Sequence, residues 1–178
     1  NQWETSSHYA KSKYLAEVTA LCMCRQGLPV VVVNPCAPVG ARDIKPSSTG
    51  QRILDYLHGK IPSFIEGGIN FVPVTDVAEG HVLAAEKGRI GQRYILGHRE
   101  GNLLLRDFLA LMERVSGVRP PRTVKHSPLK SALEAPLLAL RSGAGRGETR
   151  NLSDLRPKAL TCDPSKAIRE LGLPQTPL

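Results

Sequence analysis

Aromatic residues are scarce in this chain, and long apolar runs are absent. Phe, Tyr and Trp make up 4% of the 178 residues. The longest clear apolar run, LPVVVV at 28–33, has the length of a strand, whereas a membrane span needs roughly 18 apolar residues. The stretch from Arg119 to Lys158 has no aromatic residue, so it lacks the stacking platform of a single-strand nucleic-acid binder. We therefore expect neither a membrane span nor a nucleic-acid partner.

The cysteines lack the spacing of a structural zinc site. Cys22 and Cys24 form a C-x-C pair, and Cys36 and Cys162 stand alone, whereas zinc sites use paired C-x-x-C spacings. We interpret all four as packing residues and expect no metal site. Free thiols, together with the absence of a signal-peptide pattern, favour a reducing compartment. We therefore expect a cytoplasmic protein.

Basic charge is concentrated late in the chain. The formal net charge is +8, and nine Lys or Arg against three acidic residues between Arg119 and Lys158 place +6 of it there. Such a field suits an anionic partner, for example a phosphate-bearing small molecule, although it is also typical of a solvated face. A chain of 178 residues is long enough for one compact domain and too short for two full ones.

Helix and strand patterns alternate along the first hundred residues. Apolar residues at helical spacing predict a helix over 6–25, and the β-branched stretch 28–35 predicts a strand buried on both faces of a parallel sheet. A helix followed by a buried strand is typical of α/β folds. The Pro-, Gly- and Ser-rich stretch 36–50 predicts a long functional loop. Further expected elements are a helix over 51–60 with Ser48 or Thr49 at its start, strands over 69–74 and 91–97, and helices over 77–88, 104–117 and 165–172.

Capping residues mark the ends of three of these elements. Asp76, with Glu79 three residues later, is typical of a capping box at a helix start. Gly88 predicts the end of the same helix. In the tail, Asp163 predicts a helix start and Gly172 a helix end.

Tyr9 and Lys13 stand four residues apart on the first expected helix, so they share one face. A tyrosine that transfers protons near neutral pH needs a pKa of about 7 instead of about 10, a difference of roughly 4 kcal/mol. One positive charge at about 4 Å supplies roughly that energy at an effective dielectric constant of about 20. A lysine is therefore a sufficient activator, although Y-x-x-x-K also occurs on ordinary helix surfaces.

The order of motifs resembles the extended short-chain dehydrogenase/reductase superfamily. The first motif is YAKSK at 9–13, and one helix length later comes the strand that ends in NP. The stretches that then follow in the superfamily's order are FVPVTDVAEGHVLA, RYILG and DPSKAIRELG. The stretches 31–53 and 58–81 are similar to the hopanoid-associated sugar epimerases almost throughout. Dihydroflavonol-reductase-like enzymes are the neighbouring family. The resemblance covers most of the chain and is loose from 126 to 157.

The resemblance implies roles for five residues. Tyr9 would be the catalytic acid or base at the substrate hydroxyl or carbonyl. Lys13 would bind the nicotinamide ribose and lower the pKa of the tyrosine. Pro35, Cys36 and Ala37 would line the nicotinamide pocket, largely through their backbone. The implied cofactor is NAD or NADP.

Three further residues are candidates for substrate binding. Asn34 resembles the position that contacts substrate phosphate in sugar epimerases, although an asparagine there also serves simply to cap a loop. Arg122 and Arg146, in the basic segment, are candidates for charge-assisted contacts with a nucleotide diphosphate. The implied partners are a small-molecule substrate, either a nucleotide-sugar or a carbonyl compound, and a second copy of the complete enzyme in a homodimer.

The expected fold class is α/β, the C-terminal part of a Rossmann-type doubly wound parallel sheet plus a small mixed substrate-binding lobe. Residues 1–36 and 70–97 would supply the last Rossmann elements, and 37–69 and 98–178 the lobe. The superfamily's Gly-rich turn, which holds the pyrophosphate, and its catalytic Ser or Thr are missing from this sequence. We therefore expect a C-terminal fragment without the N-terminal dinucleotide-binding half.

The resemblance implies an NAD(P)-dependent epimerase or dehydratase acting on a nucleotide-sugar, with hydride transfer to and from nicotinamide. A dihydroflavonol-reductase-like carbonyl reductase would use the same Tyr and Lys, so that alternative stays open. A third alternative is a non-enzymatic remnant that binds an anionic partner through the basic segment. On either enzymatic reading, we expect this chain alone to be inactive.

Overall fold

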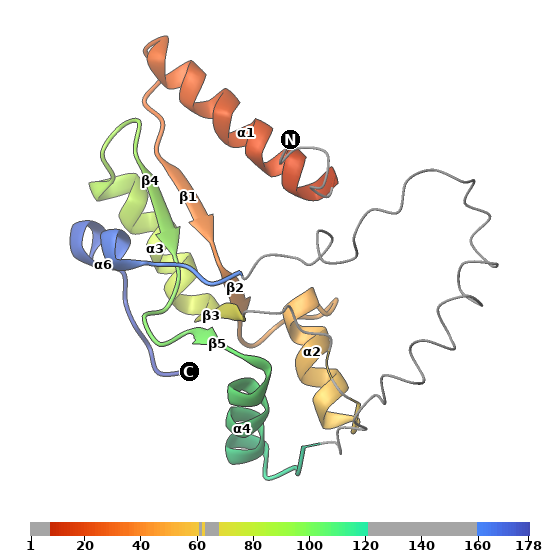
Figure 1. Ribbon diagram of the computed structural model, residues 1–178. Coiled ribbons are helices and arrows are strands. Elements are labelled where there is room, and N and C mark those ends of the chain that lie inside the picture. Colours follow the sequence, from red (N-terminus) through yellow and green to blue (C-terminus); the bar gives the residue numbers. More distant parts are fainter. Residues whose placement is uncertain (1–7, 61, 63–67, 121–159) are drawn as a thin grey trace, which may run out of the picture.

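The computed structural model describes residues 8–60, 62, 68–120 and 160–178 (Figure 1). Helices and strands alternate through this part of the chain, as expected. The elements, in chain order, are α1 (His8–Arg25), β1 (Val32–Pro35), β2 (Ala37–Val39), α2 (Ser48–Leu57), β3 (Ile69–Pro73), α3 (Val74–Lys87), β4 (Arg93–Leu96), β5 (Asn102–Leu103), α4 (Leu105–Ser116) and α6 (Ser165–Leu171).

Two small sheets form the centre of the molecule. β1 and β4 pair in parallel, with Asn34 opposite Ile95. The second sheet has the order β2-β3-β5, in which β2 and β3 are parallel and β5 is antiparallel to β3. The parallel strands confirm the expected α/β class. β3 belongs largely to the expected Rossmann segment 70–97, whereas its partners β2 and β5 belong to the expected lobe. The proposed division into Rossmann elements and lobe stays a prediction.

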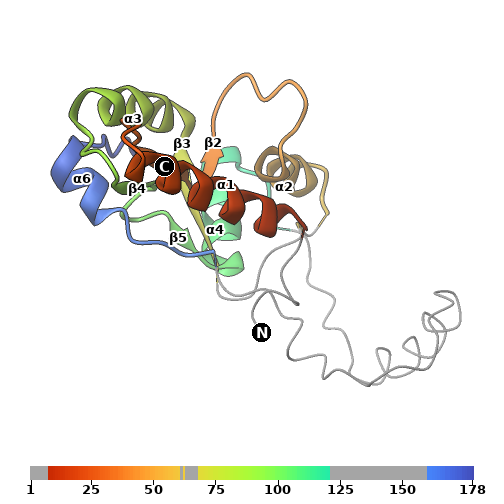
Figure 2. The ribbon, with the colours of Figure 1, turned by 90° about the horizontal axis from the view of Figure 1, so that it is seen from above.

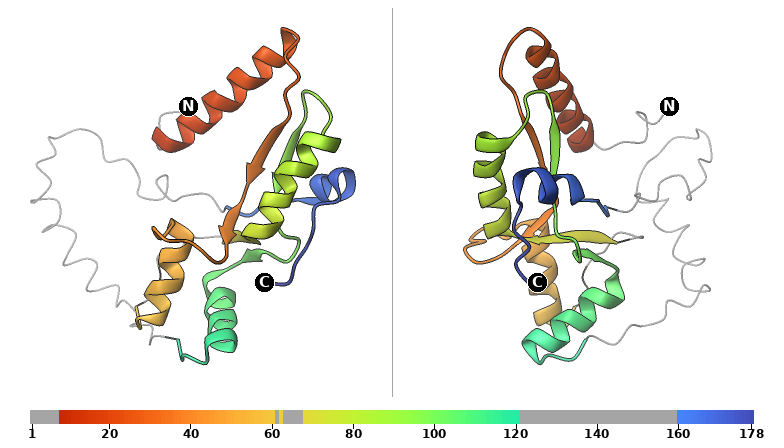
Figure 3. Two further views of the ribbon diagram at one scale, coloured as in Figure 1. Left: turned by 180° about the vertical axis from the view of Figure 1, so that it is seen from behind. Right: turned by 90° about the vertical axis from the view of Figure 1, so that its left-hand side faces the viewer.

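Helices cover both faces of the β1–β4 pair. The right-hand view of Figure 3 shows α1 on one side of these strands and α3 on the other. α6 packs against α3 and β4. The largest core cluster lies between these elements and consists of Val72, Val77, Ala84, Tyr94, Leu96, Ala167, Leu171 and Leu173.

A second, smaller cluster supports the other sheet. Ile69 and Phe71 of β3 pack with Phe108 of α4, and all three are buried. The two phenyl rings are stacked, with centroids 5.3 Å apart, which is a favourable separation for an aromatic pair. Phe108 therefore lies on the packed face of α4.

Burial of β1 is incomplete, contrary to the prediction of a strand buried on both faces. Its first three residues are half-buried and Pro35 is exposed. In the part of the chain that the structure describes, β4 is the only strand paired with β1. α1 likewise has no buried residue within that part. The described neighbours of 28–35 therefore leave part of its apolar surface uncovered.

The stretch 36–50, predicted to be a loop, contains the short strand β2. α2 begins at Ser48, one of the two predicted start residues. Ser47 is its N-cap, and the Ser47 hydroxyl accepts a hydrogen bond from the Gly50 amide at 3.1 Å. Asp43 holds this cap, because its carboxylate accepts bonds from both the amide and the hydroxyl of Ser47. Ser48 is then the first helical residue.

The predicted capping box at Asp76 is wrong. α3 begins at Val74, directly after β3, and Asp76 is a buried residue within its first turn. Its carboxylate accepts hydrogen bonds from the amide and the hydroxyl of Thr176, at 2.8 and 2.7 Å. Asp76 therefore ties the C-terminal segment to α3.

The predicted helix ends are confirmed at Gly88 and Gly172, the C-cap residues of α3 and α6. Gly172 has a φ of 77°, a left-handed conformation that favours glycine. At the start of α6, Asp163 accepts hydrogen bonds from the amide and hydroxyl of Ser165. The N-cap of α6 is Pro164, so Asp163 lies one residue before the cap position that it was predicted to occupy, although its carboxylate still binds the first helical residue. Among the helices described, none has both the length and the apolar character that a bilayer span requires.

Asp76→Ala should lower the free energy of unfolding by about 2 kcal/mol, because it removes the buried charged acceptor of two hydrogen bonds from Thr176. Glu79→Ala, on an exposed site of the same helix, should change it by less than about 0.5 kcal/mol. Urea denaturation of both variants measures the difference. Equal losses would favour the capping box instead of the tie to the C-terminal segment.

Candidate active site

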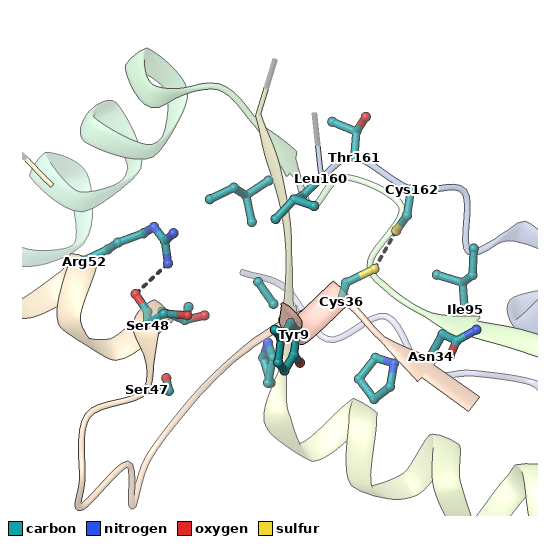
Figure 4. A pocket seen from close by; sticks show the side chains of 15 residues that line it. Tyr9, Asn34, Cys36, Ser47, Ser48, Arg52, Ile95, Leu160, Thr161 and Cys162 are labelled. Carbon is teal, nitrogen blue, oxygen red and sulfur yellow. Dashed lines mark hydrogen bonds between the residues drawn. The ribbon is translucent and has the colours of Figure 1, made fainter. Parts of the chain in front are cut away.

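A cavity of about 580 Å³ opens at the carboxyl end of β1 (Figure 4). Its lining combines α1, the β1–β2 junction, the start of α2 and the segment 160–162. In the view from above, the N-terminal end of α1 lies toward α2 (Figure 2). Ligands of α/β proteins bind outside the carboxyl ends of parallel strands, and this cavity has that location.

Tyr9 and Lys13 lie together on one face of α1. The Lys13 Nζ atom is 5.7 Å from the centroid of the Tyr9 ring, within the range of a cation–π contact. Tyr9 lines the cavity and is 71% exposed, so its hydroxyl is accessible to a bound molecule. The arrangement can support proton transfer at a substrate oxygen, with a positive charge beside the phenol.

Pro35, Cys36 and Ala37 also line the cavity. The Cys36 amide donates a hydrogen bond of 3.0 Å to the Leu96 carbonyl, which continues the pairing of β1 with β4 beyond the end of the strand. Ala37 then begins β2. The chain therefore passes directly from one sheet to the other at this wall, and its backbone is fixed on both sides.

Asn34 lines the same cavity and is tied to α1. Its side-chain Nδ2 donates a hydrogen bond of 2.9 Å to Glu17, and the other carboxylate oxygen of Glu17 accepts a bond of 2.8 Å from Arg93. The hydrogen bond from Arg93 is the main cause that holds the pKa of Glu17 below its ordinary value; the bond from Asn34 adds to it. This cluster joins α1, β1 and β4.

Glu17 was not identified from the sequence as a site residue. It stands eight residues after Tyr9, about two helical turns, so the two side chains project from similar sides of α1. Nothing in the local sequence indicates that its partners come from β1 and β4. Its hydrogen bonds position the helix that carries Tyr9.

The first turn of α2 adds polar groups that the sequence analysis also missed. Ser48, Thr49 and Arg52 line the cavity, and Thr49 is buried. The Arg52 guanidinium donates a 2.6 Å hydrogen bond to the Ser48 carbonyl. Partial burial lowers the pKa of Arg52. A helix N-terminus together with an arginine favours a negatively charged ligand group.

The interpretation of all four cysteines as packing residues is wrong for Cys22, whereas Cys36 packs against the larger core cluster. Cys22 is exposed on α1. Cys36 and Cys162 are half-buried and line the cavity, with their Sγ atoms 2.7 Å apart. Among the described residues, no group of three or more His, Cys, Asp or Glu is arranged to hold a metal ion.

Arg122 and Arg146, with most of the basic segment, lie outside the described residues.

Comparison with known proteins places this geometry in a family. The model of the NAD dependent epimerase/dehydratase family matches residues 1–97, which include α1, the β1–β2 junction and β4. The chain belongs to this family. The match includes Tyr9, Lys13 and the wall formed by Pro35, Cys36 and Ala37.

Individual relatives cover nearly the whole chain. A Synechocystis protein provisionally named dihydroflavonol 4-reductase is 39% identical over 177 residues, covering 94% of this chain and 50% of the relative. Sterol demethylase protein B of Methylococcus capsulatus is 31% identical, covering 98% of this chain and 54% of the relative. The structure of a nucleoside-diphosphate-sugar epimerase from Pseudomonas aeruginosa is 27% identical, with a TM-score of 0.73, covering 97% and 51%. The chain thus spans about half the length of these relatives.

Arg93→Met should raise the pKa of Glu17 toward its ordinary value of 4.5, because the principal hydrogen bond to the carboxylate is lost. A lowered carboxyl pKa stabilises the fold above the unfolded-state pKa, and this stability is lost as the pH falls through the folded-state pKa. The stability difference between the parent chain and Arg93→Met should therefore be largest above about pH 5 and shrink below about pH 4.

Urea denaturation across this pH range measures the effect. Arg106→Met is a matched control. Arg106 is exposed, and the one ion pair it forms within the described residues is with its neighbour Asp107. A stability difference for Arg93→Met that stays constant from neutral to acid pH would contradict the role of Glu17.

Proposed function

We propose that this chain carries the Tyr–Lys part of the active site of an NAD(P)-dependent epimerase or dehydratase that acts on a nucleotide-sugar. One observation carries the proposal. Tyr9, with Lys13 beside its ring, lines a cavity whose wall is the β1–β2 junction at the carboxyl end of a parallel strand. Family membership supports the same reaction class.

The residues present fit a nicotinamide group in this cavity. Pro35, Cys36 and Ala37 would hold the ring largely through a backbone already fixed by the two sheets, and Ile95 adds an apolar side chain to the lining. Lys13 would bind the ribose. A nicotinamide dinucleotide bound there supplies the hydride acceptor and donor. The choice between NAD and NADP belongs to the part of the site outside these residues.

Tyr9 would move the proton at the substrate oxygen. Its exposed hydroxyl is accessible to a substrate, and the Lys13 ammonium lies beside its ring. Glu17, bound to Asn34 and Arg93, would hold α1 so that the hydroxyl keeps its position over the wall. The chain's own contribution is therefore positioning and proton transfer.

A nucleotide-sugar substrate suits the charge of the cavity. The first turn of α2 presents Ser48 and Thr49, and Arg52 supplies a cation on the same wall. Together they would favour the diphosphate. The nucleoside-diphosphate-sugar epimerase from Pseudomonas aeruginosa supports this substrate class. Asn34, Arg122 and Arg146 remain candidate substrate contacts, and the homodimer remains a prediction.

A carbonyl reductase is the second candidate. The provisional name of the 39% identical Synechocystis relative favours it, and the same Tyr and Lys would serve. The two reactions differ in what happens to the dinucleotide. An epimerase returns the hydride to the substrate, whereas a reductase consumes one reduced dinucleotide for each alcohol formed. The remaining alternative, an anion-binding remnant, rests on a basic segment that lies almost entirely outside the described residues.

Tyr9→Phe in the complete protein should lower kcat by about 10²- to 10⁴-fold, the usual contribution of a positioned acid or base. The ring and its contact with Lys13 are kept, so the loss isolates the hydroxyl. Tyr14→Phe is the matched control on the same helix, because Tyr14 is not among the residues lining the cavity, and it should retain turnover. Steady-state kinetics with both variants measure the effect. Turnover of Tyr9→Phe within a few-fold of the parent enzyme would remove Tyr9 from the mechanism.

A substrate deuterated at the carbon that bears the reacting hydroxyl separates the two candidate reactions. The epimerase should yield both epimers with the label retained and no net change in the dinucleotide, because the hydride returns to the same substrate. NMR of the products and the absorbance of the reduced dinucleotide measure both quantities. Stoichiometric change of the dinucleotide with a single product would establish the reductase instead.

A further inference from the structure

Two thiols that are distant in the sequence meet in the cavity wall. The Cys36 and Cys162 Sγ atoms are 2.7 Å apart, although 126 residues separate them (Figure 4). A disulfide bond is about 2.05 Å long, so closure requires only a small further approach. Family membership and the proposed oxidoreductase activity give neither thiol a chemical role of its own.

The backbone of each cysteine is held by its own set of hydrogen bonds. Cys36 is fixed to β4 through the Leu96 carbonyl. Cys162 is clamped by Asn102, whose Nδ2 donates to the Cys162 carbonyl at 3.0 Å and whose Oδ1 accepts from the Cys162 amide at 3.1 Å. Buried Asn70 in turn donates to Asn102 at 2.8 Å. The short distance therefore comes from two anchored segments.

Gly97 provides the space that the two sulfur atoms occupy. A Cβ atom at this position would lie 2.7 Å from the Cys162 Sγ and 3.0 Å from the Cys36 Sγ, closer than packed atoms approach. A larger residue would separate the thiols or displace the strand end. The two cysteines and this glycine thus form one local arrangement.

The pKa values of the two thiols are shifted in opposite directions. The two thiols share one hydrogen bond in which either sulfur can be the donor. This bond raises the pKa of Cys36, which burial raises further, and lowers the pKa of Cys162. The thiolate is the attacking form in thiol–disulfide exchange. Within the residues described here, the pair has no third His, Cys, Asp or Glu ligand, so the arrangement favours sulfur exchange over metal binding.

We propose that Cys36 and Cys162 form a reversible disulfide by exchange with a low-molecular-weight disulfide such as oxidised glutathione. The Cys162 thiolate attacks one sulfur of the small disulfide and releases one thiolate, leaving a mixed disulfide on Cys162. Cys36 then gives up its proton to the solvent and attacks the Cys162 sulfur, and the second small thiol leaves. Two protein thiols are oxidised and one small disulfide is reduced to two thiols. The closed bond joins the segment 160–162 to the part of the cavity wall that Cys36 forms.

The experiment equilibrates the full chain in glutathione buffers of increasing oxidised fraction, blocks free thiols with an alkylating agent, and measures intact mass. Cys22→Ser/Cys24→Ser provides the background, because it leaves only the proposed pair. This chain should lose two alkylatable thiols and about 2 Da, the mass of two hydrogens, and yield one peptide linking 36 to 162. Dithiothreitol should reverse the change. Removing Cys36 from the same background, as Cys36→Ser, should leave glutathione attached at Cys162.

Two results would overturn the proposal. One is that both thiols stay alkylatable in the most oxidising buffer. The other is that glutathione stays on Cys162 while Cys36 remains free. Circular dichroism and unfolding compare Cys162→Ser and Cys162→Ala with the background and show whether each variant is folded. A folded variant of either kind must fail to form the bond. The readout is chemical and needs no turnover, so its failure is distinguishable from failure of the proposed enzyme activity.

Discussion

The parallel pairing of β1 with β4 is the constraint on which the rest of the described structure depends. Because parallel strands end at the same edge of a sheet, the β1–β2 junction and the chain after β4 emerge together, and the cavity opens there. α1 is held over this edge by Glu17, which accepts hydrogen bonds from both strands through Asn34 and Arg93. The position of Tyr9 is therefore a consequence of strand pairing as well as of its own helix.

Periodicity and composition predicted the elements that are regular over many residues. α1, α2, α3, α4 and α6, and strands β1, β3 and β4, all lie within or close to their expected ranges. The short strands β2 and β5 could not be predicted, because two or three residues carry no period and exist only through pairing with β3. The same limit explains Asp76, whose partner Thr176 is 100 residues away, so that a local capping pattern gave the wrong interpretation.

The candidate site was predictable where its residues are close in sequence. Four-residue spacing on a helix brings Tyr9 and Lys13 together, and the end of an apolar strand indicated the wall from Pro35 to Ala37. Glu17, Arg52 and Cys162 escaped because their contacts depend on how the two sheets and three helices are arranged. Cys36 shows both sides of this limit: its place in the wall was expected, whereas its thiol partner was not.

The central claim is that Tyr9, Lys13 and the β1–β2 junction face one nicotinamide ring. A crystal structure of the complete protein with bound NAD or NADP tests it most directly. The account predicts the nicotinamide against the backbone of Pro35 to Ala37, with its ribose within hydrogen-bond distance of Lys13 and the Tyr9 hydroxyl on the substrate side of the ring. A dinucleotide bound in full occupancy with its nicotinamide away from Tyr9 and from this junction would contradict the account.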